Sequence, residues 1–289
     1  MSAMDGRGAL TIVVLTHDRR DEVLRTLAHL ASLPGRWPVV VVDNGSTDGT
    51  GPTVRERFPQ MTLIRVARNR GAAARNLGVQ AARTPYVAFC DDDTQWEPGA
   101  LERAVAILDV APKVGVLSAR VMVGADRRPD PACQAMADTP LDSTGLPGRR
   151  ILGFMAGACV MRRQAFLDAK GYWRPFFIGA EEALLALDLA QLGWSMVYAP
   201  EVVTRHFPST RRDAPRRRYL LARNAIWTGW MRLPAAMAWR RTTSRLRAAP
   251  GMAGRLRLAC GVLAGLPRAL MRRSVVAPDV QDMLARLEG

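Results

Sequence analysis

Long hydrophobic runs are missing from this sequence of 289 residues, although 48% of its residues are apolar. The longest apolar stretch in the last third, residues 258–267, is about half the length that a transmembrane helix needs. The run at residues 10–15 is likewise too short for a signal peptide. We therefore expect a globular, cytoplasmic protein with a sizeable core and no transmembrane helix.

Cysteine is also scarce. The four cysteines do not show the paired spacing of zinc ligands, and two of them lie inside apolar runs; they are Cys90, Cys133, Cys159 and Cys260. We expect neither a disulfide framework nor a zinc site, which fits a reducing cytosol.

Acidic residues are scarce in the last third of the chain. Residues 205–289 contain 18 arginines and four acids, a net charge of +14, whereas residues 1–204 contain 23 basic and 22 acidic residues, a net charge of +1. Apolar residues alternate with these arginines at roughly helical intervals, which favours an interfacial amphipathic segment on an anionic membrane. A nucleic-acid arm more often carries lysine and exposed aromatic rings, so nucleic acid is not the expected partner. The remaining alternative is a solvated helical face.

The first hundred residues alternate between short apolar runs and helical patterns, which predicts an α/β fold with a mostly parallel sheet. Strands are predicted at residues 10–15, 39–42, 63–66 and 86–90, and helices at 21–33, 49–58 and 72–82. Later segments predict helices at 99–108, 164–170 and 181–192, strands at 114–123, 154–161 and 194–199, and a long surface excursion at 124–150. From residue 216 the pattern is helical, with breaks at Pro234, Pro250 and Pro267.

Three consecutive aspartates, Asp91, Asp92 and Asp93, directly follow the apolar run of residues 86–90. Open α/β sheets bind ligands at the carboxyl ends of their strands, and Mg²⁺ or Mn²⁺ binds one or two carboxylates together with phosphate oxygens. A divalent metal that carries a diphosphate therefore suits this cluster. The alternative is a solvated turn, because residues 94–98 also resemble a helix start.

Four motifs in order resemble family 2 glycosyltransferases of the GT-A fold, and bacterial rhamnosyl- and galactofuranosyltransferases in particular. They are residues 14–19 (VLTHDR), 41–50 (VVDNGSTDGT), 69–78 (NRGAAARNLG) and the acidic triplet. The resemblance covers residues 10–225. It implies a GT-A catalytic domain at residues 8–215, followed by a basic amphipathic helical region at residues 216–289.

The resemblance also implies a donor site. Asp43 would accept the imide N–H of uracil or thymine, and Thr16 would contact the nucleoside. Gly71 would allow close backbone approach, and Arg75 would supply fixed charge to the base or diphosphate. Without the resemblance, Asp43 is a turn or capping residue and Arg75 a surface helix residue.

In the triplet, the resemblance implies that Asp93 binds the metal most directly and that Asp91 approaches the ribose or metal-bound water, with Asp92 as a further donor contact. His206 follows the late strand at the place where related enzymes present a histidine to metal or diphosphate, although a lone histidine is more often structural. Arg223 would contact the diphosphate or pack the C-terminal region against the catalytic domain.

Transfer needs a base for the acceptor hydroxyl, and Glu181 and Glu182 resemble the acidic pair of the family at a helix start. Glu182 would be the catalytic base and Glu181 would position it or the acceptor. Acids also favour the first turn of any helix. The family often has an acid at the position of Leu184 and an arginine at that of Asp188, and neither is kept here, which puts acceptor identity in doubt.

Together these features predict a metal-dependent, inverting glycosyltransferase that uses Mg²⁺ or Mn²⁺ and transfers a hexosyl or deoxyhexosyl group. UDP- and dTDP-linked donors fit Asp43 better than GDP-linked donors. The acceptor would be a hydroxyl of a glycan, a lipid-linked sugar or a small molecule, in the synthesis of cell-envelope polysaccharide, glycolipid or a related glycoconjugate. The basic tail would dock on the inner face of the membrane.

Two other functions remain open from the sequence. A sugar nucleotidyltransferase shares the α/β plan, but it needs a glycine-rich phosphate loop after the first strand, where residues 16–19 are Thr-His-Asp-Arg. A degenerate GT-A fold that serves as a membrane-docked binding module would explain the tail and leave the ordered acidic motifs unexplained.

Overall fold

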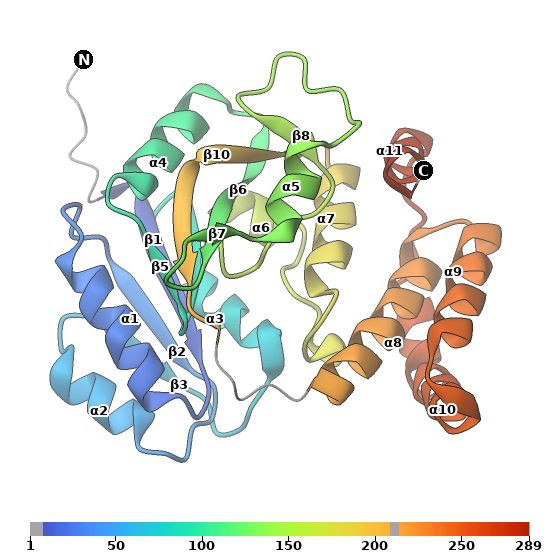
Figure 1. The fold of residues 1–289 in the computed structure, drawn as a ribbon, viewed down its shortest axis with the longest axis horizontal. Helices are drawn as coiled ribbons and strands as arrows, with labels where there is room; N and C mark the ends of the chain where they lie inside the picture. The colour runs from blue at the N-terminus through green and yellow to red at the C-terminus, as the bar shows by residue number, and fades with distance from the viewer. Residues whose placement is uncertain (1–7, 209–213, 289) are drawn as a thin grey trace.

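One sheet of ten strands forms the centre of the protein, and a group of helices follows it at the C-terminus (Figure 1). The computed structural model describes residues 8–208 and 214–288; residues 209–213, close to the expected boundary at residue 215, and residue 289 lie outside it. The strands are β1 (Leu10–Thr16), β2 (Val39–Asp43), β3 (Thr62–Arg65), β4 (Tyr86–Asp91), β5 (Thr94–Trp96), β6 (Val114–Val123), β7 (Arg128–Pro129), β8 (Arg149–Ile151), β9 (Cys159–Arg162) and β10 (Ser195–His206).

Helices separate most of these strands and form the C-terminal region. They are α1 (Arg20–Ser32), α2 (Thr50–Arg57), α3 (Arg75–Ala81), α4 (Ala100–Val110), α5 (Pro131–Ala137), α6 (Arg163–Asp168), α7 (Glu181–Gln191), α8 (Ala214–Arg232), α9 (Ala235–Ala248), α10 (Gly251–Leu270) and α11 (Pro278–Glu288). Two short 3₁₀ helices, η2 (Gly71–Ala74) and η3 (Arg174–Phe176), precede α3 and α7.

The strand order is β3-β2-β1-β4-β9-β6-β10-β5, with β7 beside β6 and β8 beside β10. The pairings of four or more residues are all parallel: β1 with β2, β1 with β4, β2 with β3, and β6 with β10. The pairings made by β5, β7, β8 and β9 span two or three residues and are antiparallel. The sheet is thus mixed, and its long pairings are parallel, as the sequence pattern predicts.

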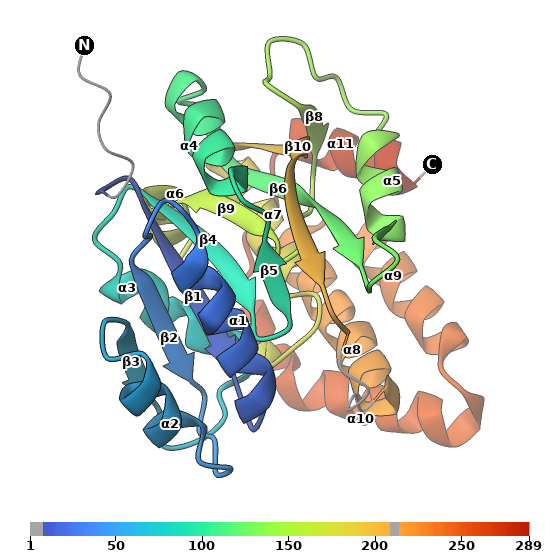
Figure 2. The same cartoon turned by 60° about the vertical axis from the view of Figure 1, so that its left-hand side comes forward.

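Helices cover both faces of the sheet. Ile12 and Val14 of β1 pack on one face with Leu27 of α1, and α1 and α2 lie in front of the sheet in Figure 2. Val13 points to the other face, where it packs with Val79 of α3, because successive side chains of a strand alternate. Valine-rich strands that are buried on both faces are typical of such three-layer α/β folds.

The C-terminal helices pack against α7 (Figure 1). Leu184 of α7 joins a cluster with Ile226 of α8 and Leu258 of α10, and Leu187 packs with Val280 of α11. The opposite side of α7 packs on the sheet. Helix α7 therefore connects the sheet to the C-terminal helices. Among the described helices, none combines the length and apolarity needed to cross a bilayer.

Several elements differ from the sequence predictions. Residues 94–96 form strand β5 instead of a helix start, and β10 continues to His206, seven residues beyond its predicted end, because the two segments pair with each other. The predicted strand at 154–161 is shorter, and the excursion at 124–150 contains α5, β7 and β8. Pro267 does not break α10, which ends at Leu270. Leu263, Ala264 and Pro267 are exposed, so this turn of the helix lies at the surface, where a missing N–H costs less than in a buried turn.

Candidate active site

The carboxyl ends of three neighbouring parallel strands bring the predicted donor residues to one edge of the sheet. Thr16 of β1 is in register with Asp43 of β2, and Leu15 of β1 is in register with Asp91 of β4. The hydroxyl oxygen of Thr16 is buried and has no hydrogen-bond partner among the described residues. A buried polar atom of this kind usually has a partner, so this edge is suited to a polar ligand.

Asp43 lies at the end of β2, where its carboxylate is 0% exposed. Its Oδ1 accepts a hydrogen bond from the backbone N–H of Ser46 at 3.0 Å, and its Oδ2 accepts one from Nε of Arg65 at 2.8 Å. Gly51 borders this carboxylate closely, and a Cβ at that position would collide with Arg65. Arg65, whose side chain is 44% exposed, thus occupies Oδ2 of the Asp43 carboxylate.

Arg19 neutralises part of the aspartate triplet. Its Nη1 donates to Asp92 Oδ1 at 2.9 Å and to Asp93 Oδ2 at 3.2 Å. Burial, and then the charges of Asp93 and Asp91, raise the pKa of Asp92 to about 7, although Arg19 opposes this shift. The triplet is thus a group of carboxylates that favours additional positive charge.

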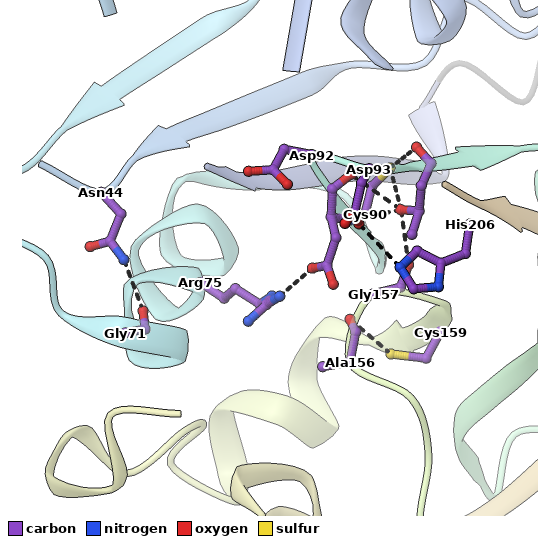
Figure 3. A network of polar contacts seen from close by, with 12 residues as sticks. Asn44, Gly71, Arg75, Cys90, Asp92, Asp93, Ala156, Gly157, Cys159 and His206 are labelled. Carbon is purple, nitrogen blue, oxygen red and sulfur yellow. Dashed lines mark hydrogen bonds and ion pairs between the residues drawn. The ribbon is translucent and has the colours of Figure 1, made fainter. Parts of the chain in front are cut away.

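Asp93 and His206 meet because β5 pairs with the end of β10. His206 is opposite Thr94 in this pair, and the backbone N–H of Phe207 donates to the carbonyl oxygen of Asp93 at 2.8 Å. Asp93 Oδ1 then lies 3.5 Å from Nε2 of His206 (Figure 3). The structure therefore brings together two of the three residues that the resemblance implies as metal ligands, with Asp91 on the same strand end.

Carboxylate oxygens and an imidazole nitrogen are a donor set that Mn²⁺ or Mg²⁺ accepts. In residues 8–208 and 214–288, no three His, Cys, Asp or Glu side chains converge as a ready metal cage. Mg²⁺ usually binds one or two protein carboxylates and takes its other ligands from phosphate and water. The residues present thus fit a cation that arrives with a diphosphate.

Arg75 is buried at the start of α3 and its Nη2 donates to Asp91 Oδ1 (Figure 3). Burial alone would lower the pKa of Arg75, but the charges of Asp91 and Glu181 raise it, so the guanidinium stays charged. Gly157 lies against the other side of Asp91, where a Cβ would collide with the carboxylate. Asp91 is therefore fixed between a cation and a backbone segment.

Gly71 contacts the turn that leads into α7. It has φ +62°, and a Cβ there would collide with the carbonyl oxygen of Phe177. The N–H of Ala72 donates to this same carbonyl at 2.6 Å. Asn44 holds the segment from the other side, because its Nδ2 donates to the carbonyl of Gly71 at 3.1 Å (Figure 3). The segment after β3 thus joins the end of β2, through Asn44, to the turn before α7.

Glu181 and Glu182 begin α7. Glu181 is 5% exposed, and its Oε2 has no hydrogen-bond partner among the described residues. Burial raises the pKa of Glu181, and burial followed by the neighbouring charge of Glu181 raises the pKa of Glu182 to about 8. Arg75 and Asp91 also act on both pKa values, so this pair belongs to the same charged cluster. A carboxyl with a pKa near neutrality is suited to proton transfer.

The turn before α7 is conformationally strained. Phe177 and Ala180 have φ angles of +64° and +60°, and Gly179 has φ +90°. Residues with side chains rarely adopt positive φ, and such conformations persist where surrounding structure holds them. The strain lies directly before the two glutamates, which points to a positioning role for whatever holds this turn.

Asn224 of α8 holds the turn, a role that the sequence analysis did not predict. Its Nδ2 donates to the carbonyl oxygens of Phe176, Ile178 and Gly179, at 2.9, 3.1 and 2.6 Å. The neighbouring Arg223 donates to the carbonyl of Phe176 at 3.1 Å and lies 4.2 Å from the ring of Trp227. Arg223 is thus placed beside the turn before α7, and none of its contacts in the described chain is with the aspartate triplet.

The two departures from the family pattern face the C-terminal helices. Leu184 is buried against α8, and Asp188 forms an ion pair with Arg232 of α8 in which Nη2 lies 3.2 Å from Oδ2. An arginine at position 188 would face Arg232 with like charge. These residues therefore attach α7 to α8.

Arg19 and Asn44 are further site residues to which the sequence analysis gave no role. Both follow strands, β1 and β2, that end at the sheet edge beside Asp91. Residues in this position commonly contact ligands, so the sequence could have predicted that Arg19 and Asn44 lie at the site. Asn224 belongs with Arg223 to a segment that resembles a helix-borne motif of the family, but its role at the turn was not predicted, because the carbonyl groups to which it donates are more than 40 positions earlier in the chain.

Comparisons with known proteins agree on the fold and the family. The profile described as glycosyl transferase family 2 matches residues 11–169. The N-acetylglucosaminyl-diphospho-decaprenol L-rhamnosyltransferase of Mycobacterium tuberculosis is 31% identical over 248 residues, which cover 71% of this chain and 78% of the relative.

Two solved structures share the fold at low sequence identity. The mannosyltransferase PcManGT from Pyrobaculum calidifontis, in complex with GDP-Man and Mn²⁺, is 21% identical with a TM-score of 0.59, covering 98% of this chain and 86% of that one. GalNAc-T7 with UDP, GalNAc and Mn²⁺ is 14% identical with a TM-score of 0.61, covering 81% of this chain and 50% of that one. The architecture is therefore the GT-A fold, and the chain belongs to glycosyl transferase family 2.

Proposed function

We propose that this glycosyltransferase moves a deoxyhexosyl or hexosyl group, with inversion, from a UDP- or dTDP-linked donor to a hydroxyl of a lipid-linked acceptor in cell-envelope glycan synthesis. The observation that carries the proposal is the position of Glu182. It is a partly buried carboxyl with a raised pKa, and the charges of Asp91 and Arg75, at the carboxyl ends of the strands, act on it. This coupling supports a proton acceptor beside the proposed diphosphate site.

The donor would lie along the carboxyl ends of β1, β2 and β4. Thr16 and Asp43 would contact the nucleoside, Asp43 after Arg65 moves aside, and Arg75 would lie beside the diphosphate. A divalent metal held by Asp91, Asp93 and His206 would neutralise the charge of the departing diphosphate. Asp92, bound to Arg19, would hold that arginine at the same edge.

Glu182 would act on the acceptor. The acceptor oxygen bonds to the anomeric carbon while the bond from that carbon to the diphosphate oxygen breaks, and the hydroxyl proton moves to the Glu182 carboxylate. Glu181 would keep the pKa of Glu182 high enough to accept this proton. Asn224 would fix the turn that aims both carboxyls.

Two observations support a lipid-linked acceptor at a membrane. The mycobacterial relative is named for an N-acetylglucosaminyl-diphospho-decaprenol acceptor and an L-rhamnosyl group. Helix α10 also exposes an apolar stripe whose members are 42–76% exposed: Met252, Leu256, Leu263 and Leu270. At about 100° per residue these four lie within about 40° of one another around the helix axis. Such a stripe beside arginines suits an anionic membrane surface.

A transfer assay with matched variants tests the proposal. Membranes or lipid extracts would be incubated with the protein, Mn²⁺ and each of several labelled UDP- and dTDP-sugars, and label in the lipid fraction would be counted. We expect one donor to label lipid with wild type, and Glu182→Gln to lose transfer while its donor binding survives. Glu181→Gln is the control, because it changes the same charge one residue away and should retain measurable transfer. Normal transfer by Glu182→Gln would exclude it as the base.

A further inference from the structure

We propose that a basic cavity between η3, α8 and α10 binds the diphosphate of the lipid-linked acceptor; this inference rests on the proposed function. The cavity has a volume of about 690 Å³, and its walls include Arg174, Arg223 and Arg268 with the rings of Tyr219 and Trp227. It is separate from the aspartate triplet, whose residues do not line it.

The charge around this cavity has one sign. Residues 214–278 contain 14 arginines and no aspartate or glutamate. In the part of the chain that the structure describes, no ion pair joins Arg174, Arg223 or Arg268 to a carboxylate. Arg174 and Arg268 can form paired hydrogen bonds to phosphate oxygens, whereas Nε and Nη2 of Arg223 already donate to Asn224 and Arg223 adds its positive charge. Three guanidinium groups around one cavity thus favour an anion with more than one negative charge.

Two aromatic rings, Tyr219 and Trp227, line the cavity and lie close to α10. Arg223 lies 4.2 Å from the ring of Trp227, and Arg257 lies 4.8 Å from the ring of Tyr219. Gly261 of α10 makes this packing feasible, because a Cβ there would collide with the Tyr219 hydroxyl. The rings and guanidinium groups therefore form a wall that is ordered before any ligand binds.

The position of the cavity on α10 fits a phosphate at a membrane surface. At about 100° per residue, Arg268 lies on the opposite side of α10 from the exposed stripe of Met252 and Leu263. A helix is about 10 Å across, so a stripe at the acyl boundary places the opposite side at the level of the headgroup phosphates. The cavity would thus meet the diphosphate while the lipid chain stays in the bilayer.

The cavity is also connected to the catalytic helix. Arg174 and Pro175 line it, and the carbonyl of Pro175 accepts a hydrogen bond from Arg223 at 3.2 Å. Glu182 follows seven residues after Pro175, a span of at most about 25 Å even when fully extended. The cavity therefore lies within about 25 Å of the proposed base, on the same side of the turn before α7 as Arg223.

Vesicle binding with three variants tests this site. Wild type is compared on phosphatidylcholine vesicles that contain polyprenyl diphosphate and on vesicles with phosphatidylglycerol at the same total charge. The double variant Arg174→Ala/Arg268→Ala removes charge from the cavity, and Ala264→Trp fills it without a change in charge. The control Arg245→Ala/Arg247→Ala removes two exposed arginines from the last turn of α9, outside the cavity.

We expect wild type to prefer polyprenyl diphosphate vesicles, and both cavity variants to lose the preference. The double cavity variant should bind them about 25-fold more weakly, at about fivefold for each arginine beside a charged surface. The α9 control should weaken binding to both vesicle types and keep the preference. Equal loss in the α9 control and the cavity variants, or no preference in wild type, would overturn the site. Inorganic diphosphate that binds as tightly as the polyprenyl form would overturn the lipid source.

Donor binding separates failure of this site from failure of the proposed function. Thermal stabilisation by nucleotide with Mn²⁺ should survive in the cavity variants, because none of the changed residues touches the triplet. Lost preference with intact nucleotide binding supports the cavity as an acceptor site. Preference that persists in the cavity variants refutes the cavity and leaves the donor site standing.

Discussion

Replacement of Asn224 with alanine should destabilise the protein and slow transfer together. The side chain is buried, and its amide donates to three carbonyl oxygens of the strained turn before α7. An amide nitrogen has two N–H groups, so about two full hydrogen bonds are lost, and a buried unsatisfied group costs about 1–3 kcal/mol. We expect the free energy of unfolding to fall by about 2–4 kcal/mol.

The same change should reduce kcat by about 10- to 100-fold, because a small displacement of a catalytic group has effects of this size. Met231→Ala is the matched control: Met231 is also buried on α8, its loss costs about 2–5 kcal/mol, and its side chain donates no hydrogen bond to the carbonyl groups of the turn. Urea unfolding would confirm comparable destabilisation, and kcat would be measured well below the unfolding temperature. A comparable loss of kcat in the Met231→Ala protein would refute a positioning role for Asn224.

Three further predictions concern the glutamate pair and the segment at Gly71. Burial and the charge of Glu181 raise the pKa of Glu182 to about 8, so kcat should rise as the pH passes through this value. The Glu181→Gln variant should show this rise at lower pH. A pH profile that does not move in this variant would contradict the coupling of the two carboxyls. The folded state binds this proton more tightly than the unfolded state, so the stability associated with protonated Glu182 is lost as pH rises through about 8. In urea unfolding, Glu182→Gln should therefore be about 2–4 kcal/mol more stable than wild type near pH 9 and equal to wild type near pH 4. If the variant is no more stable than wild type near pH 9, the pKa of Glu182 is not raised. Gly71→Ala should lower the free energy of unfolding by about 1–3 kcal/mol and weaken nucleotide binding, because the new Cβ must collide with the Phe177 carbonyl. Wild-type values for both in calorimetry would contradict this close contact.

The parallel part of the fold followed from the sequence because its signals are local. Apolar runs bounded by turn residues predicted β1 to β4. Since the carboxyl ends of parallel strands meet at one edge of a sheet, Thr16, Asp43 and Asp91 were expected to lie together there, as they do. Family membership and the GT-A fold, which the motifs implied, are confirmed by the comparisons. The roles of individual site residues remain predictions that the variants above are designed to test.

Long-range pairing accounts for what the sequence did not reveal. The segment Thr94–Trp96 resembles a helix start by its residues and becomes a strand because β10 supplies a partner more than 100 residues later. Asn224 acts on carbonyl groups whose sequence carries no matching signal, since backbone acceptors are present at every residue. Proline lacks a backbone N–H and usually ends a helix, so Pro267 predicted the end of a helix. In the structure it lies inside α10, at a turn that is exposed.

We propose above that the sheet edge at Thr16, Asp43 and Asp91 binds a nucleoside diphosphate together with a metal. The most direct test is a thermal-shift screen of UDP, dTDP, GDP and their sugars, with and without Mn²⁺, on wild type, Asp93→Ala and Glu182→Gln. We predict that UDP or dTDP compounds stabilise wild type and Glu182→Gln in a Mn²⁺-dependent manner and do not stabilise Asp93→Ala. No Mn²⁺-dependent stabilisation of wild type by any nucleotide, or full stabilisation of Asp93→Ala, would show that this edge does not bind a nucleotide through a metal.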